Sequence, residues 1–149
     1  MASLSDAGVR RLSGKGPVQA VFRGEATLLK INAATTQTRR LKKMVAAFCR
    51  KEVGARRPSF DPFEVRIWTS VLETKKGAHD VDNIAKACLD ALNGIFWRDD
   101  RQVMRLTSEK FIGDANEIAI LVRPLPAPPE ATRLDETLFD RLSNNSDRD

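Results

Sequence analysis

The segment from Lys75 to Val103 constrains the fold of this chain more than any other, because it combines helical apolar spacing with paired acids. Its apolar residues recur on one helix face: Ile84, Cys88, Ala91, Leu92 and Ile95. This pattern predicts a helix from about Val81 to Asn93 that ends at Gly94. A helix with one apolar stripe has to pack that stripe against another element, so the segment predicts a layered fold.

Strand patterns on both sides of this helix complete the expected fold. Alternating apolar residues over 63–71 predict a strand with one buried face, and a helix with a basic outer face is expected over 36–53. The other expected strands cover 17–31 with a break near Gly24, 102–112, and 116–123 after a hairpin connection at 113–115. The order β-α-β-α-β-β predicts an α/β, or α+β-like, fold with two helices packed on one mixed sheet.

The two ends of the chain differ from the middle in composition. Residues 1–16 are polar and are expected to form a flexible leader, whereas residues 17–124 are expected to form the folded domain. Residues 125–149 begin Pro-rich and then become acidic. This composition predicts a linker and a disordered tail, with at most one helical turn around Leu134–Leu142.

Positive charge is concentrated in the expected folded part. The formal net charge is +5, and residues 128–149 contribute −3, which leaves +8 for residues 1–127. A surplus of this size favours a polyanionic partner such as nucleic acid or an anionic membrane surface. No stretch is long and apolar enough to span a bilayer, and the N-terminus lacks a signal-peptide pattern, so we expect a cytoplasmic protein. Cys49 and Cys88 lie in apolar helical patterns and are expected to be buried, reduced thiols.

Acidic residues gather at the start of the expected helix over 81–93 and along one of its flanks. Asp80 and Asp82 are two residues apart in extended chain, so their carboxylates point to the same side, and Asp82 can cap the helix. Asp82, Lys86 and Asp90 then recur every four residues on the flank opposite the apolar stripe. The helix is therefore expected to have one side that packs in the core and another that carries the candidate functional residues.

A second acidic pair, Asp99 and Asp100, follows the apolar residues 95–97, which would draw the pair inward beside the sheet. Clustered carboxylates repel one another unless a cation neutralises them, and ligands that are all oxygen favour Mg²⁺ or Mn²⁺ over zinc. Such an ion suits the hydrolysis of a phosphodiester. Lys86 is well suited to placing positive charge near the reacting phosphate.

Each of these groups also has a structural alternative. Asp82 can be only an N-cap, Lys86 and Asp90 only an i, i+4 ion pair, and Asp99 with Asp100 only a polar turn. None of these alternatives accounts for Asp80.

Residues 80–103 together carry the pattern D-V-D-N-x-x-K-x-x-x-D-A-L-N-G-x-x-W-x-D-D-x-Q-V. This pattern closely resembles the signature of the RusA family of Holliday junction resolvases, and the order of elements on either side agrees. The resemblance implies a RusA-like fold and a homodimer that binds branched DNA in the form of four-way junctions. It also implies that Mg²⁺, with Mn²⁺ as a substitute, supports symmetric nicks in two opposing strands. Neither a small-molecule cofactor nor a membrane is expected.

The resemblance assigns roles within the segment. Asp80, Asp82 and Asp100 match the family's metal-binding carboxylates, and Lys86 matches its essential lysine, so these four are the expected catalytic residues. The expected supporting residues are Asn83, Asp90 and Asp99.

Basic residues before and after the acidic segment are expected to contact DNA phosphates. They are Lys75, Lys76, Arg98, Arg101, Arg39, Arg40 and Lys43. His79 is expected to be an exposed loop residue, and Trp68 and Trp97 are expected to lie in the core or a dimer interface. The chain departs from the family after its first strand, where I-N-A-A-T-T-Q-T-R-R stands in place of a Pro/Asn-containing loop and an aromatic-basic segment. This departure bears on junction affinity rather than on cleavage.

The sequence leaves three functions open. They are a junction resolvase, a nuclease for other branched DNA, and a non-catalytic DNA-binding dimer whose acids are structural. The combination of three acids with a lysine favours an enzyme, because a binding module has no use for concentrated negative charge facing DNA.

Overall fold

The computed structural model describes residues 9–13, 16–33, 38–49 and 58–146. Its strands are β1 Val9–Ser13, β2 Val18–Arg23, β3 Ala26–Ile31, β4 Phe63–Val71, β5 Val103–Ile112 and β6 Glu117–Pro124. Its helices are α1 Thr38–Phe48, α2 Val81–Leu92 and α3 Leu138–Ser146. Two short 3-10 turns, η3 Glu73–Lys75 and η4 Asp100–Gln102, lie before and after α2.

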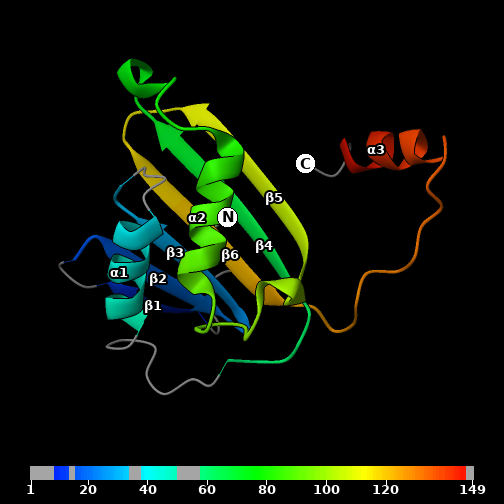
Figure 1. Cartoon of the computed structure of the whole chain (residues 1–149), viewed down its shortest axis with the longest axis horizontal. Coiled ribbons are helices and arrows are strands. Elements are labelled where there is room, and N and C mark those ends of the chain that lie inside the picture. Colours follow the sequence, from blue (N-terminus) through cyan, green and yellow to red (C-terminus); the bar gives the residue numbers. More distant parts are fainter. Residues whose placement is uncertain (1–8, 14–15, 34–37, 50–57, 147–149) are drawn as a thin grey trace.

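The strands form one sheet in the order β1-β2-β3-β6-β4-β5, and α1 and α2 lie side by side on one of its faces (Figure 1). The sheet is mixed, because β4 and β5 pair in parallel while the other neighbours pair antiparallel. Parallel strands need a crossover connection, and α2 is that connection. The expected α+β fold with one mixed sheet under two helices is confirmed.

The order of elements differs from the expected β-α-β-α-β-β. Residues 17–31 form two strands rather than one, because a two-residue turn at Gly24 and Glu25 folds β3 back onto β2. Gly24 has a φ of +58°, which favours glycine. Val9–Ser13 also differs from the flexible leader expected for residues 1–16, since it pairs along β2 and gives that strand's outer backbone groups hydrogen-bonding partners.

The expected hairpin between the last two strands is wrong. β6 lies between β3 and β4, whereas β5 lies on the other side of β4. The loop between them crosses the end of β4, where the Gly113 N–H donates to the Val71 carbonyl at 2.9 Å and the Ser70 hydroxyl donates to the Ala115 carbonyl at 2.7 Å. Alternate residues of β6 are fully buried while β5 is mostly exposed, which suits a central and an edge strand respectively.

The core lies between the sheet and the two helices. The apolar stripe predicted for α2 is buried, and α1 contributes Leu41 and Val45. Both cysteines, Cys49 and Cys88, are free and buried as expected, and burial raises the pKa of their thiols to about 11 and about 12. The largest fully buried side chains include Trp97, Leu29, Ile31, Leu41, Ile67, Ile84, Leu92, Ile118 and Ile120.

The chain leaves the sheet after β6 and ends in α3, which stands apart from the sheet in Figure 1. This helix is longer than the single turn expected around Leu134–Leu142 in a disordered tail. The Asp135 carboxylate stabilises the turn before α3 by accepting hydrogen bonds from the Thr137 hydroxyl at 2.6 Å and from the Thr137 N–H at 2.9 Å. These bonds lower the pKa of Asp135. None of the helices among the described residues has the length and apolar character needed to cross a membrane.

Candidate functional site

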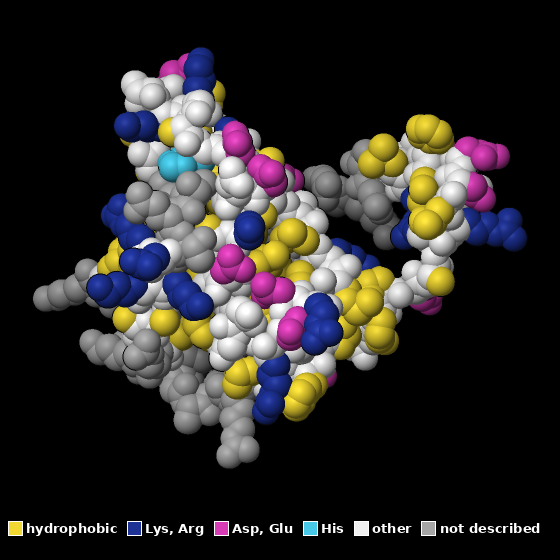
Figure 2. Space-filling view, in the orientation of Figure 1, with side chains coloured by type: hydrophobic (Ala, Val, Ile, Leu, Met, Phe, Trp, Pro, Cys, Tyr) yellow, Lys and Arg dark blue, Asp and Glu magenta, His cyan; other side chains and the backbone are white. Residues whose placement is uncertain are grey.

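A groove of about 530 Å³ runs between α2 and β5. Its charged lining consists of Asp82, Lys86, Asp90 and Asp100, so four residues that the sequence singles out come together. Figure 2 shows acidic side chains along this middle part of the molecule, with Lys and Arg side chains gathered over α1 beside them. The remaining lining residues are Val81, Ala85, Leu89, Leu106 and Ser108.

Helical geometry explains why one flank of α2 faces the groove. Asp82, Lys86 and Asp90 share that flank as predicted, while Ile84 and Cys88 on the opposite side are fully buried. Within the part of the chain that the structure describes, no ion pair joins Lys86 to Asp90. The structural alternative of an i, i+4 ion pair therefore does not hold.

The expected helix cap at Asp82 is wrong. α2 begins at Val81, so Asp80 occupies the N-cap position with extended backbone, at φ −86° and ψ 143°, and Asp82 lies in the first turn. The Asp80 side chain makes no capping bond either, and its Oδ2 accepts only a long hydrogen bond of 3.5 Å from Asn83 Nδ2. Both carboxylates are exposed at the helix N-terminus, where the dipole favours negative charge. Asp80 does not line the groove itself.

Asp100 is held at the groove by Trp97. The indole Nε1 donates to Asp100 Oδ1 at 2.8 Å, and the ring is fully buried, with its centroid 5.6 Å from that of Phe63. The apolar segment thus draws Asp100 inward, as expected, and leaves it half-buried. Trp97 is a core residue, whereas Trp68 is only partly buried, with the Arg66 guanidinium 5.2 Å from its ring centroid.

Asp99 stabilises the turn that carries Asp100. As the N-cap of η4, its carboxylate accepts hydrogen bonds from the Arg101 backbone N–H at 2.9 Å and from Arg101 Nε at 3.0 Å. The backbone bond, followed by the guanidinium bond, lowers the pKa of Asp99. Gln102 completes the capping box by accepting from the Asp99 N–H at 3.0 Å. Arg101, a candidate for DNA contact, is engaged by Asp99 although its side chain is 90% exposed.

The other basic candidates lie at the surface on several elements. Lys76, next to η3, pairs with Glu73 at 2.8 Å, and Arg98 immediately precedes Asp99. The remaining candidates are all exposed: Arg39, Arg40 and Lys43 on α1, and Lys75 in η3.

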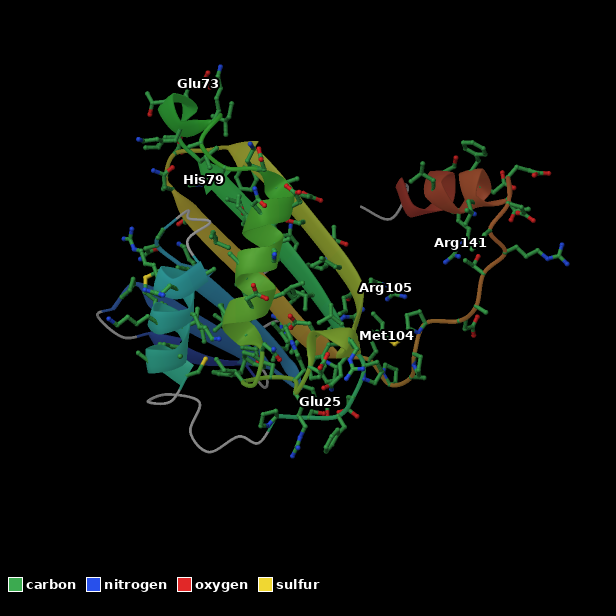
Figure 3. All side chains as sticks on the ribbon, in the orientation of Figure 1. Glu25, Glu73, His79, Met104, Arg105 and Arg141 are labelled. Atoms are coloured by element: carbon green, nitrogen blue, oxygen red, sulfur yellow. The ribbon has the colours of Figure 1, made fainter. Side chains whose placement is uncertain are left out.

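His79 differs from the exposed loop residue that was expected. It is half-buried at the start of α2 (Figure 3), and its Nδ1 is buried without a hydrogen-bonding partner among the described residues. β5 contacts the backbone of this stretch: Lys110 Nζ donates to the His79 carbonyl at 2.7 Å, and the Ser108 hydroxyl donates to the Val81 carbonyl at 3.4 Å. Sequence reasoning missed Ser108 and Lys110 because it paired β5 with β6. The period of two along β5 does place Ser108 and Lys110 on the same face of that strand.

The donor types in and beside the groove fit a hard cation. Asp82 and Asp100 offer carboxylate oxygens to the same space, and Asp80 lies at the start of the same helix. In the described ranges, no three His, Cys, Asp or Glu side chains are already gathered into a metal centre. A cation would relieve the mutual repulsion of these acids.

The domain is basic and has an α+β fold, and one lysine lies among the carboxylates of its surface groove. These features together define a class of proteins suited to act on a nucleic-acid backbone. The family described as Endodeoxyribonuclease RusA matches residues 19–123, and the chain belongs to this family. The resemblance stated for residues 80–103 is therefore confirmed.

One relative is a Bacillus subtilis (strain 168) protein named "Uncharacterized protein YqaN". It is 38% identical to this chain over 48 residues. The matched segment covers 32% of this chain and 34% of YqaN, so the chain spans about a third of that relative's length.

Proposed function

We propose that this chain is a Mg²⁺-dependent, structure-selective endodeoxyribonuclease that resolves four-way DNA junctions in recombination and repair. The observation that carries the proposal is the groove in which Asp82, Lys86, Asp90 and Asp100 meet without ion pairs to one another. This groove lies in a chain whose first 127 residues carry a charge of +8. Membership of the RusA family supports the same reading.

We assign the metal to Asp80, Asp82 and Asp100. Held there, Mg²⁺ would supply a positive charge that polarises the phosphodiester and stabilises the departing oxygen. Trp97 fixes the orientation of Asp100 through the 2.8 Å hydrogen bond to one carboxylate oxygen. Lys86 places positive charge beside the phosphate oxygens as negative charge builds on them. The residues assigned supporting roles are Asn83, Asp90 and Asp99.

We further propose that the protein acts as a homodimer. A four-way junction has pseudo-two-fold symmetry, so a two-fold dimer presents one groove to each of two opposing strands. Paired, symmetric nicks follow from that geometry. We propose that residues 17–124, together with β1, form the nuclease domain and that residues 125–149 are an appended linker and tail. A DNA substrate favours a cytoplasmic location.

Cleavage of a synthetic four-way junction tests the proposal. With Mg²⁺ or Mn²⁺, the wild-type chain should convert the junction into nicked duplexes, and a linear duplex should survive. Asp82→Asn and Asp100→Asn should each lower the rate by at least about 100-fold, because a metal ligand is lost. Junction binding should be kept, because each change also removes a negative charge that faces DNA. Asp114→Asn, in the exposed loop after β5, is the matched control and should cut normally.

Other outcomes discriminate between the three functions. Binding without cleavage under either metal would favour a non-catalytic DNA-binding dimer. Preferential cutting of three-way or forked DNA would favour a nuclease for other branched structures. Nicks mapped to unrelated positions on the two strands would contradict a symmetric dimer.

A further inference from the structure

Phe60 presents an aromatic ring to solvent. Its side chain is 76% exposed, and the Arg98 guanidinium lies over the ring, 4.2 Å from the centroid. Single exposed apolar side chains are ordinary on protein surfaces. Phe60 differs because the backbone on both sides of it is fixed.

Gln102 fixes the segment that carries Phe60. Its Nε2 donates to the carbonyls of Ser59 at 2.8 Å and Asp61 at 2.9 Å, the residues directly before and after the phenylalanine. The Ser59 N–H donates to the Phe96 carbonyl at 3.1 Å, and the Ser59 hydroxyl donates to the Asp61 carboxylate at 2.6 Å. The ring is therefore presented from a fixed backbone, which reduces the conformational entropy lost when a ligand packs on it.

The same glutamine links Phe60 to the turn that carries Asp100. Gln102 lies in η4 with Asp100, and its Oε1 accepts from the backbone N–H groups of Arg98 at 2.8 Å and Asp99 at 3.0 Å. The exposed ring, the guanidinium over it and the carboxylate of the groove thus belong to one hydrogen-bonded unit. A DNA strand bound at Asp100 would pass close to this unit.

We propose that Phe60 stacks on a base that has lost its stacking neighbour at the branch point of the DNA, while Arg98 contacts the adjacent phosphate. In a linear duplex both faces of each internal base are already covered, so the ring gains nothing there. At a branch, a crossover base has a free face, and an aromatic side chain can cover it. The guanidinium covers one face of Phe60 and leaves the other for the base. This inference rests on the proposed function and gives it a source of selectivity for branched DNA.

Binding measurements on the full chain test the inference. Affinities for a four-way junction and for a linear duplex are measured in EDTA, so that no strand is cut. Phe60→Ala should weaken junction binding about tenfold and duplex binding less than about twofold, and Phe60→Trp should restore junction binding. Phe139→Ala removes a comparably exposed ring, 73% exposed on α3, and should change neither affinity.

A crosslink gives a direct readout of the contact. Photoactivated 5-iodouracil placed at the branch should crosslink to the peptide that contains Phe60. The inference is overturned if Phe60→Ala leaves junction affinity unchanged or weakens binding to both DNAs equally. It is also overturned if Phe60→Trp does not restore junction binding, or if the crosslink forms elsewhere in the chain. Cleavage by the wild-type chain judges the proposed function separately. If the wild-type chain cuts the junction and Phe60→Ala binds it with unchanged affinity, only the stacking proposal is refuted. If the Phe60 results support stacking but the wild-type chain does not cut, only the nuclease proposal is refuted.

Discussion

At the scale of single residues, Trp97 shows how a buried side chain sets the position of a charged one. Its indole nitrogen has to find an acceptor inside the protein, and Asp100 Oδ1 supplies one at 2.8 Å. Packing holds the ring, so one carboxylate oxygen is fixed while the other is left for a ligand. A carboxylate oriented in advance loses less conformational freedom when it binds a cation.

Lys86→Met tests the role of the lysine that lines the groove, because it removes the charge and keeps the length of the side chain. We expect single-turnover cleavage of a four-way junction to fall about 10²–10³-fold, since charge that develops on the phosphate loses a cationic neighbour. Junction affinity should fall less than about tenfold, and Lys86→Arg should recover part of the rate. Equal losses of affinity and rate would assign Lys86 to binding alone.

Residue spacing predicts some of the site but not all of it. The helical period places Asp82 and Lys86 on one flank, and that geometry does not depend on tertiary contacts. The predicted and observed helices both begin at Val81, so the N-cap is Asp80, and the cap predicted at Asp82 lies two residues too far along the chain. The contact between Phe60 and Arg98 joins segments far apart in the chain, so periodicity carries no signal for it.

At the scale of elements, α2 is both the crossover between two parallel strands and the carrier of the site. The chain leaves β4 at one end of the sheet and has to return to the other end before β5 begins, and α2 spans that distance. β5 is an edge strand, so the groove between it and α2 lies at the margin of the sheet. The topology that requires a helix therefore places its acidic flank where a DNA backbone can approach.

Gly94→Ala tests how α2 ends. Gly94 has a φ of +82°, a conformation that costs an L-residue about 1–2 kcal/mol, so the free energy of unfolding in urea should fall by about that amount. No other group lies within 4 Å of the added Cβ, so the loss comes from the backbone rather than from a clash. Gly77→Ala has the same open surroundings without a positive φ and should leave stability nearly unchanged. Equal losses in both variants would contradict this account.

The extents of the elements could be predicted more closely than their pairing. Alternation marks β4 at residues 63–71, and helical spacing marks α2 to within a residue of its observed end. Strand pairing is different, because a glycine-containing loop such as 113–116 serves a hairpin and a crossing over a neighbouring strand equally well. The burial of β6 and the exposure of β5 decide between the two, and both depend on the assembled sheet.

At the scale of the whole molecule, the charges are divided between regions. The groove is acidic and would repel DNA by itself, whereas α1, on the other side of α2, carries exposed basic side chains (Figure 2). Residues 128–149 add a charge of −3, and the described part of this segment leads away from the sheet (Figure 1). Affinity for a polyanion therefore has to come from the basic surface, with a cation making the groove compatible with phosphate.

The salt dependence of junction binding tests this division. Each phosphate contact releases counterions and adds about 0.9 to the slope of log affinity against log salt concentration. Replacing Arg39, Arg40 and Lys43 together with glutamine should make that slope shallower by about 2–3, because up to three contacts are lost. Arg133→Gln, in the segment before α3, is the control and should leave the slope unchanged. The cleavage rate at saturating enzyme should be the same in both proteins, because neither change touches the groove. A slope that does not respond to the three substitutions would exclude α1 as a DNA-binding surface, and a fall in the saturated rate would show that α1 also positions the scissile strand.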